Sequence, residues 1–313
     1  MTASKPVLIV MNFMADAHLA QMAEWLEVVY APDAAQFAQA LSSHGARAQV
    51  VLTIGSTGLS AAQMDAMPQL RLVGALGAGY ENIDVPYAKA RGIAVSNGAG
   101  TNDNCVADHA FGLVIAAVRG LLPLDQSTRQ GIWRTQIPLP AQVSGKRLGV
   151  VGLGTIGQKI ARRAQAFDMP VGYHNRHPKD GAAYDYFDSL QGLAQWADVL
   201  VVATPGGAGT RHLVNAQVLD ALGPRGYLVN IARGSVVDTA ALAQALRDGR
   251  LAGAGLDVYE SEPQPPAELL ELNNVVLTPH VAGWSPEAVQ ATVDLFLDNV
   301  QRHFAGEPLM TPI

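Results

Sequence analysis

Residues 147–159 read Arg-Leu-Gly-Val-Val-Gly-Leu-Gly-Thr-Ile-Gly-Gln-Lys, and this stretch decides the fold of the chain around it. An apolar run typical of a buried strand leads into Gly152, Gly154 and Gly157, and helix-favouring residues follow. In a strand–turn–helix unit, the first glycine permits a tight turn, the second lets a pyrophosphate approach, and the third packs helix against strand. The alternative is a glycine-rich turn in an ordinary α/β domain. The legible strand and helix favour a dinucleotide-binding domain.

The composition indicates a globular chain with an acidic balance. At 313 residues the chain is too long for one ordinary core and suits two domains. Its 49% hydrophobic and 15% charged residues argue against disorder. A formal net charge of −6 without any basic run argues against nucleic-acid binding. The first apolar run lasts only a few residues, so we expect a first strand there and neither a signal peptide nor a membrane span.

The single cysteine, Cys105, excludes an intramolecular disulfide and a cysteine-based metal cluster. We interpret it as a buried thiol on an apolar helix face and not as a nucleophile. No His-Glu-x-x-His motif or similar ligand spacing occurs, and none of the histidines outside the candidate site stands with spaced carboxylates in the sequence. We therefore predict no catalytic metal. A cytoplasmic location is the default expectation for such a chain.

Alternating apolar runs and helical patterns in the first hundred residues predict a parallel sheet with helices on both faces. The run 75–84 follows a predicted strand directly, at the edge where open α/β sheets bind ligands. We therefore expect the backbone N–H groups of Ala78 and Gly79 to bind a carboxylate. A long helical pattern over 101–119 would link two domains.

Residues 121–144 are rich in Pro, Gln and Gly around Trp133, and we expect an arm there without a core element. The second unit begins at Arg147 and contains six predicted strands in one doubly wound sheet. The helices expected in it include a short one at 267–270. A last helix is expected over 286–304, with Pro in its first turn and Gly306 just past its end. The predicted class is α/β, with two doubly wound parallel-sheet domains.

Three polar residues follow predicted strands of the second unit, at the carboxyl edge where a cofactor would lie: Arg233, Glu262 and His280. Each one alone also fits an ordinary loop residue. Together they form a chemical set, because an Arg fork binds a carboxylate, a His moves a proton near neutral pH, and a carboxylate orients the His. The pattern favours a catalytic site at this edge.

Four motifs identify a resemblance to a known family. They are Val-Gly-Leu-Gly-Thr-Ile-Gly at 151–157, Asn-Ile-Ala-Arg-Gly-Ser-Val-Val-Asp at 230–238, Gly-Leu-Asp-Val-Tyr-Glu-Ser-Glu-Pro at 255–263 and Thr-Pro-His-Val-Ala-Gly at 278–283. In this order they resemble the D-2-hydroxyacid dehydrogenases, especially the NADPH-dependent glyoxylate/hydroxypyruvate reductases. The resemblance covers essentially the whole chain.

The resemblance implies a role for each site residue. His280 would be the acid/base, Glu262 its partner, and Arg233 the group that binds the substrate carboxylate and carbonyl. Ala78 and Gly79 would donate backbone N–H groups to that carboxylate. Asp257 would hold the nicotinamide amide, and Thr204-Pro205 would lie beside the cofactor. The expected cofactor contacts are Gly152, Gly154, Thr155, Ile156, Gly157, Asn175, Arg176, Thr204, Pro205 and Asp257.

The resemblance also implies a discontinuous domain organisation. A flavodoxin-like substrate domain would comprise residues 1–99 and 284–313, with a Rossmann-type dinucleotide-binding domain at 100–283 inserted in it. A twofold homodimer through the nucleotide domain is implied as well. The implied function is reduction of a small 2-keto acid, such as glyoxylate or hydroxypyruvate, to the D-2-hydroxy acid. The alternative is a dinucleotide-sensing interaction protein of the corepressor type on the same fold.

The end of the second strand in the nucleotide unit bears on which cofactor is used. NAD-type sites place an acidic residue about 20 residues past the glycine motif, where it binds the ribose hydroxyls. Here the strand ends in Asn175 and Arg176, and the nearby Asp168 precedes the strand. A guanidinium can bind a 2′-phosphate that a carboxylate would repel. We therefore expect NADPH to be preferred over NADH.

Overall fold

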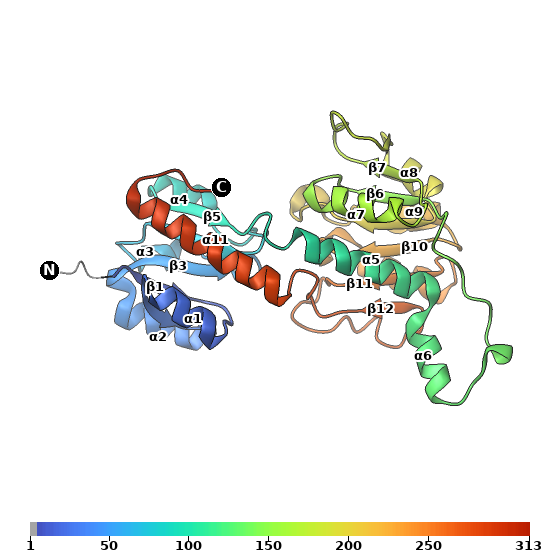
Figure 1. The fold of residues 1–313 in the computed structure, drawn as a ribbon, viewed down its shortest axis with the longest axis horizontal. Coiled ribbons are helices and arrows are strands. Elements are labelled where there is room, and N and C mark those ends of the chain that lie inside the picture. Colours follow the sequence, from blue (N-terminus) through green and yellow to red (C-terminus); the bar gives the residue numbers. More distant parts are fainter. Residues whose placement is uncertain (1–4) are drawn as a thin grey trace. The chain divides into compact units, whose positions relative to one another are not determined.

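The computed structural model describes residues 5–313 and divides into two compact units. The first unit comprises the chain up to Asn102 together with Trp284–Ile313, and the second comprises Asp103–Gly283. In each unit a sheet is flanked by helices (Figure 1). The second unit is thus an insertion in the first. Residues 1–4, part of the expected substrate domain, lie outside the described residues.

The first unit is built on a parallel five-stranded sheet in the order β2-β1-β3-β4-β5. The strands are β1 (Val7–Val10), β2 (Glu27–Tyr30), β3 (Ala48–Ile54), β4 (Leu72–Leu76) and β5 (Ala94–Asn97). One face packs on α2 (Ala34–His44), α3 (Ala61–Asp65) and α4 (Val85–Ala90), and the other on α1 (Asp16–Ala23) and α11 (Pro286–Ala305). Covering both faces buries most residues of the central strands, as parallel sheets require.

The second unit contains a parallel seven-stranded sheet in the order β12-β11-β10-β9-β6-β7-β8. The strands are β6 (Leu148–Val151), β7 (Val171–His174), β8 (Asp185–Tyr186), β9 (Val199–Val202), β10 (Tyr227–Asn230), β11 (Gly253–Leu256) and β12 (Val275–Leu277). The strand order reverses between β6 and β9, the point at which doubly wound sheets bind ligands. The predicted α/β class with two doubly wound sheets is confirmed.

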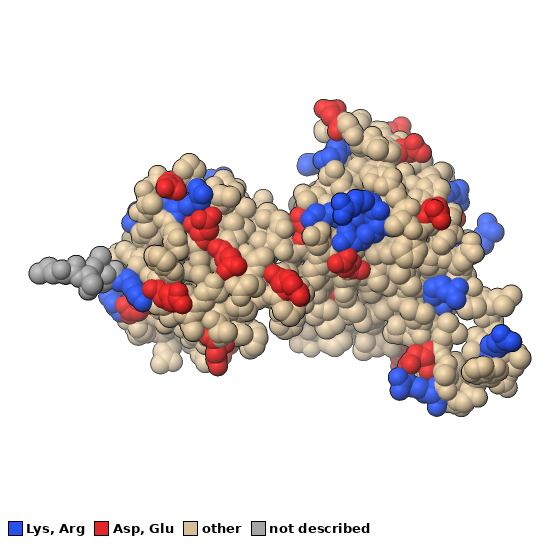
Figure 2. All heavy atoms as spheres, in the orientation of Figure 1, with Lys and Arg blue, Asp and Glu red and all other residues tan. Residues whose placement is uncertain are grey.

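Helices cover both faces of the second sheet. They are α5 (Asp103–Arg119), α7 (Thr155–Gln165), α8 (Leu190–Trp196), α9 (Ala216–Leu222) and α10 (Thr239–Arg247), whereas α6 (Leu121–Arg129) follows α5 and buries no residue. One core joins the sheet to α5 and α7, and the other joins it to α8, α9 and α10. Lys and Arg side chains gather over α7, with acidic side chains beside them (Figure 2). Two of the α7 cations pair with α5, because Lys159 faces Asp103 and Arg163 faces Asp108.

Two expectations about single elements are wrong, those for residues 267–270 and for Cys105. Residues 267–270 form turns, because so short a segment cannot offset the cost of starting a helix. The arm contains a helix, α6, in which Pro123 falls in the first turn, where a missing N–H is tolerated, but no residue of α6 is buried, so the arm holds no core element, as expected. Cys105 is half-buried on α5 and not fully buried.

The length and hydropathy of the helices bear on membrane association. Within residues 5–313, no single helix is both long and apolar enough to cross a membrane. The pair α5 and α6 reaches the length and composition only when taken together, and it is bent by 59°.

Candidate active site

The glycine loop lies between β6 and α7, at the switch point of the second sheet. Gly152 has φ +97°, and a Cβ there would lie 2.8 Å from the Ala203 carbonyl oxygen. A Cβ on Gly157 would lie 2.1 Å from the Gly152 oxygen, whereas one on Gly154 would meet nothing within 4 Å. The outer glycines are therefore required by the chain itself. The space at Gly154 suits an approaching pyrophosphate, and Thr155 and Ile156 begin α7 with unbonded N–H groups.

The end of β7 lies next to this loop. Asn175 Oδ1 accepts a hydrogen bond of 2.7 Å from the Leu153 N–H, so its side chain holds the glycine loop. Arg176 follows at once and is exposed, and its guanidinium makes no hydrogen bond or ion pair with another residue of 5–313. The chain therefore presents a cation at the position where doubly wound sheets bind the ribose of a dinucleotide.

Arg233, Glu262 and His280 lie after β10, β11 and β12, at the carboxyl edge of the second sheet. The His280 Nδ1 lies 2.8 Å from Glu262 Oε2, and Glu262 Oε1 accepts 2.8 Å from the Tyr259 N–H. Because Nδ1 is bonded to the carboxylate, Nε2 is the nitrogen available to a ligand. The charge of Arg233 acts on both partners, lowering the pKa of each. The structure thus brings the three predicted residues together.

The protonation states follow from these contacts. The hydrogen bond with Glu262 raises the pKa of His280, and this outweighs burial, which lowers it. Burial raises the pKa of Glu262, but the hydrogen bonds from His280 and from the Tyr259 N–H lower it by more. The pair therefore favours an ionised carboxylate beside a protonated imidazole. In such a pair the imidazole can donate a proton from Nε2 and can take up another proton near neutral pH.

Asp257 fixes the backbone on which His280 stands. Its side chain is only 1% exposed and accepts hydrogen bonds from the N–H groups of Val281 at 2.9 Å and Ala282 at 2.8 Å, and from the Thr278 hydroxyl at 2.6 Å. Its carbonyl accepts 2.8 Å from the His280 N–H. His280 has φ +54°, an unusual conformation for a residue with a side chain. The expected role of Asp257 toward the nicotinamide amide stays a prediction.

The Thr204-Pro205 segment follows β9 and adjoins the glycine loop. A Cβ on Gly152 would lie 2.9 Å from the Thr204 nitrogen, so the two turns are in direct contact. Further along, a Cβ on Gly206 would lie 2.8 Å from Arg233 Cγ. The segment therefore joins the glycine loop to the arginine of the triad.

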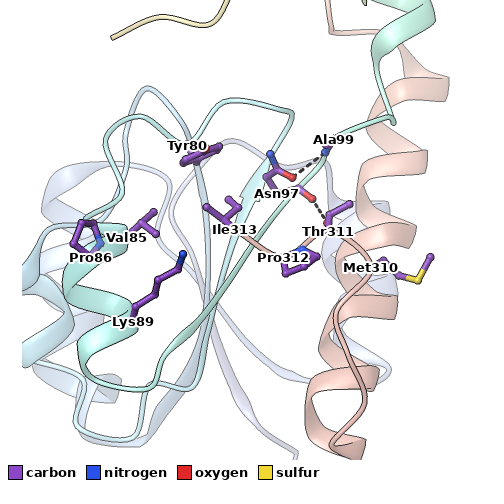
Figure 3. Close-up of a pocket in the computed structure, with 10 residues that line it drawn as sticks. All are labelled: Tyr80, Val85, Pro86, Lys89, Asn97, Ala99, Met310, Thr311, Pro312 and Ile313. Atoms are coloured by element: carbon purple, nitrogen blue, oxygen red, sulfur yellow. Dashed lines mark hydrogen bonds between the residues drawn. The ribbon is translucent and has the colours of Figure 1, made fainter. Parts of the chain in front are cut away.

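The Ala78-Gly79 loop follows β4 in the first unit. A Cβ on Gly55, after β3, would lie 2.6 Å from the Gly79 carbonyl carbon, so the two loops pack backbone against backbone. Asn97 Nδ2 donates 2.8 Å to the Ala78 oxygen. Asn97 also borders a pocket of about 740 Å³ between α4 and the end of the chain (Figure 3). The loop is thus fixed from both sides within its own unit.

Two histidines outside the triad contact a carboxylate, although neither stands with spaced carboxylates in the sequence. His212 Nε2 is 2.8 Å from Glu260 Oε1, and His109 Nε2 is 3.4 Å from Asp257 Oδ1. Sequence reasoning missed both, because the partners are far apart in the chain, 48 residues for His212 and Glu260. Within residues 5–313, no group of three or more His, Cys, Asp or Glu side chains has the arrangement of a metal site.

Comparison with known proteins gives consistent matches over most of the chain. The family model for the NAD binding domain of D-isomer specific 2-hydroxyacid dehydrogenases matches residues 111–282. A hydroxyphenylpyruvate reductase of Plectranthus scutellarioides is 42% identical over 88% of this chain and 87% of its own length. A glyoxylate/hydroxypyruvate reductase A of Arabidopsis thaliana is 42% identical over 87% and 88%.

A solved structure extends the similarity to the whole fold. It is an NADPH-dependent glyoxylate/hydroxypyruvate reductase from Sinorhizobium meliloti, in complex with NADP and malonate. It superposes with a TM-score of 0.90 at 40% identity, covering 99% of this chain and 97% of that one.

Proposed function

Because the chain belongs to the D-isomer specific 2-hydroxyacid dehydrogenase family, we propose that it reduces a small 2-keto acid, such as glyoxylate or hydroxypyruvate, to the D-2-hydroxy acid with NADPH. The observation that carries this proposal is the 2.8 Å contact between His280 and Glu262 beside Arg233. The named relatives are reductases of such acids. No observation favours the alternative of a dinucleotide-sensing interaction protein.

Each member of the triad has one task in the reaction. A bound nicotinamide dinucleotide supplies hydride for the carbonyl carbon. The Arg233 fork binds the substrate carboxylate and carbonyl oxygen, and the N–H groups of Ala78 and Gly79 add donors to the carboxylate. The Nε2–H of His280 protonates the developing alkoxide, and Glu262 stabilises the imidazolium through Nδ1. In the reverse direction, neutral His280 removes the hydroxyl proton.

The residues around the glycine loop fit a dinucleotide with a 2′-phosphate. Gly154 leaves open space where the backbone meets the start of α7, as a pyrophosphate requires. Arg176 offers a guanidinium at the end of β7, and the nearby acidic side chain, Asp168, precedes that strand. These features support NADPH over NADH. We place the protein in the cytoplasm, where a single half-buried thiol stays reduced.

Turnover by the wild type and by His280→Ala tests the function. The wild type should oxidise NADPH when glyoxylate or hydroxypyruvate is added. His280→Ala should lose roughly 10²–10⁴-fold in kcat, because general acid catalysis is worth about that much. NADPH affinity, measured by fluorescence titration, should be unchanged. A wild type inactive toward a panel of 2-keto acids, or an active His280→Ala variant, would refute the proposal.

A further inference from the structure

A second polar cluster lies in the inserted unit, at the loops that follow β9, β10 and β11. His212 Nε2 is 2.8 Å from Glu260 Oε1, and His212 Nδ1 is 3.9 Å from Asp238 Oδ2. The other Glu260 oxygen, Oε2, accepts from the N–H of Thr239 at 3.1 Å and from its hydroxyl at 2.8 Å. Arg211 Nη1 is 3.8 Å from Glu260 Oε1. Glu260 is thus bonded to two loops besides its own.

The backbone at Glu260 lies in the same loop as Glu262 and contacts the segment that follows Arg233. Glu262 lies two residues further along the same loop. A Cβ on Gly234 would lie 1.9 Å from the Tyr259 carbonyl carbon and 2.3 Å from the Glu260 nitrogen, so the segment after Arg233 packs directly on the Tyr259–Glu260 peptide. A shift of that peptide would therefore move Arg233 relative to Glu262.

The loop that carries His212 adds a third support. Its backbone N–H donates 2.8 Å to the Ser235 oxygen, and Gly206 of the same loop contacts the Arg233 side chain. His212 has φ +49°, a conformation that a residue with a side chain keeps only where surrounding contacts hold it. The 2.8 Å hydrogen bond with Glu260 is shorter than the 3.9 Å approach of its other ring nitrogen to Asp238.

The contact between His212 and Glu260 is partly shielded from solvent. The two side chains are 34% and 26% exposed, so water competes less for their hydrogen bond than it does at the open surface. Burial raises the pKa of Glu260, but the hydrogen bonds from His212 and Thr239 lower it by more. Glu260 therefore stays ionised and keeps its acceptors for both partners at neutral pH.

We propose that Glu260, held by His212 and Thr239, is a positioning residue that fixes Arg233 relative to the Glu262–His280 pair. It acts through the backbone and touches neither substrate nor cofactor. The inference rests on the proposed function, because it assigns Arg233 to the substrate carboxylate.

The kinetic test compares two Glu260 variants and one His212 variant. Glu260→Ala should lose about 10- to 100-fold in kcat/KM for glyoxylate with NADPH, since a misplacement of about 1 Å can cost that much. Most of the loss should appear in KM, because Arg233 binds the carboxylate. The pH profile of kcat should move less than in Glu262→Gln, because the Glu262–His280 bond remains and only the contribution of Arg233 to the two pKa values changes. Glu260→Gln should stay within about threefold of wild type, because an amide oxygen still accepts from Thr239 and its NH₂ reaches His212.

His212→Asn and Arg250→Ala complete the set. Asn tolerates the left-handed backbone but is too short to reach Glu260, so this variant should lose activity as Glu260→Ala does. The double variant Glu260→Ala with His212→Asn should lose no more kcat/KM than either single variant, because both remove the same contact. Arg250→Ala removes a different ion pair of the same unit, with Asp220, and should leave kcat/KM unchanged. His212→Asn also serves as the test if Glu260→Ala does not fold.

Amide hydrogen exchange gives a readout that needs no turnover. Loss of the contact should speed exchange at Val236 and Val237, whose N–H groups donate within the Arg233 loop. Arg250→Ala should not change it. Unchanged kcat/KM and exchange in Glu260→Ala would overturn the inference, as would a shifted pH profile in Glu260→Gln, which would indicate a direct role in proton transfer. A wild type without turnover would refute the proposed function alone, because exchange would still report on Glu260.

Discussion

The protonation state of the proton donor, His280, depends on one neighbour, Glu262. Reduction requires imidazolium, and the hydrogen bond with Glu262 raises the pKa of His280 so that imidazolium persists to higher pH. Glu262→Gln removes the negative charge, so the pKa of His280 should fall. The high-pH limit of kcat/KM for reduction should then move to lower pH, and oxidation, which needs neutral imidazole, should start at lower pH.

The pH dependence of kcat/KM in both directions measures this effect. Glu271→Gln is a suitable control, because it removes an exposed carboxylate of the same unit. The pairing would be wrong as the source of the shift if Glu262→Gln kept the wild-type pH profile, or if the control moved it equally.

Arg176 is the residue on which the cofactor preference depends. Its guanidinium is exposed at the end of β7 and makes no hydrogen bond or ion pair with another residue of 5–313, so its removal should leave the fold unchanged. A charged hydrogen bond is worth about 1.5–3 kcal/mol, so Arg176→Ala should lower kcat/KM for NADPH about ten- to hundredfold. The value for NADH should barely change. Equal use of both cofactors by the wild type, or equal loss of both in the variant, would show that Arg176 does not read the 2′-phosphate.

At the scale of one element, two glycines of the turn between β6 and α7 should have different roles, Gly157 in the stability of the fold and Gly154 in cofactor binding. Gly157→Ala places a methyl 2.1 Å from the Gly152 oxygen, so it should lower the free energy of unfolding by about 1–3 kcal/mol. Gly154→Ala meets no protein atom within 4 Å and has a compatible φ of −77°, so the apo protein should keep its stability.

Gly154→Ala should instead weaken NADPH binding, by about tenfold or more if the methyl costs ~1.4 kcal/mol. Urea unfolding without cofactor and fluorescence titration with NADPH measure the two effects. If Gly154→Ala binds NADPH as the wild type does, the dinucleotide does not approach the backbone at this glycine.

The sequence predicts those helices and strands whose residue pattern is continuous along the chain and several residues long. Continuous Val and Leu runs predict buried strands such as β9, and caps with Pro and Gly predict both ends of α11 within one residue. The two-residue β8 carries no such signal, because it forms only by pairing with β7. The glycine loop and the triad are also local, since each lies directly after a strand. The contacts of His212 and His109 arise only when distant loops fold together, so no spacing in the sequence reveals them.

For the whole molecule, the exposed apolar residues bear on assembly. In Figure 1, α6 and the segment after it extend away from the rest of the second unit. This arm exposes Leu121, Leu122, Trp133 and Leu139, the last at 98%, and α6 has no buried residue within the chain. Apolar surface of this kind usually marks an interface. We therefore propose a twofold homodimer in which this arm, residues 121–144, contacts the partner.

Light scattering at micromolar concentration should give a mass of about twice 32.9 kDa for the wild type. Leu122→Glu combined with Trp133→Glu should reduce it toward the monomer, because charges would be buried without partners across the interface. Both side chains are exposed in the single chain, so the two substitutions should leave the core intact and should not lower the unfolding midpoint through core damage. Phe13→Glu is the matched control, since it charges an aromatic that is 72% exposed in the first unit and should leave the dimer intact. A monomeric wild type, or dissociation by Phe13→Glu with an unaffected arm variant, would rule out the arm as the dimer interface.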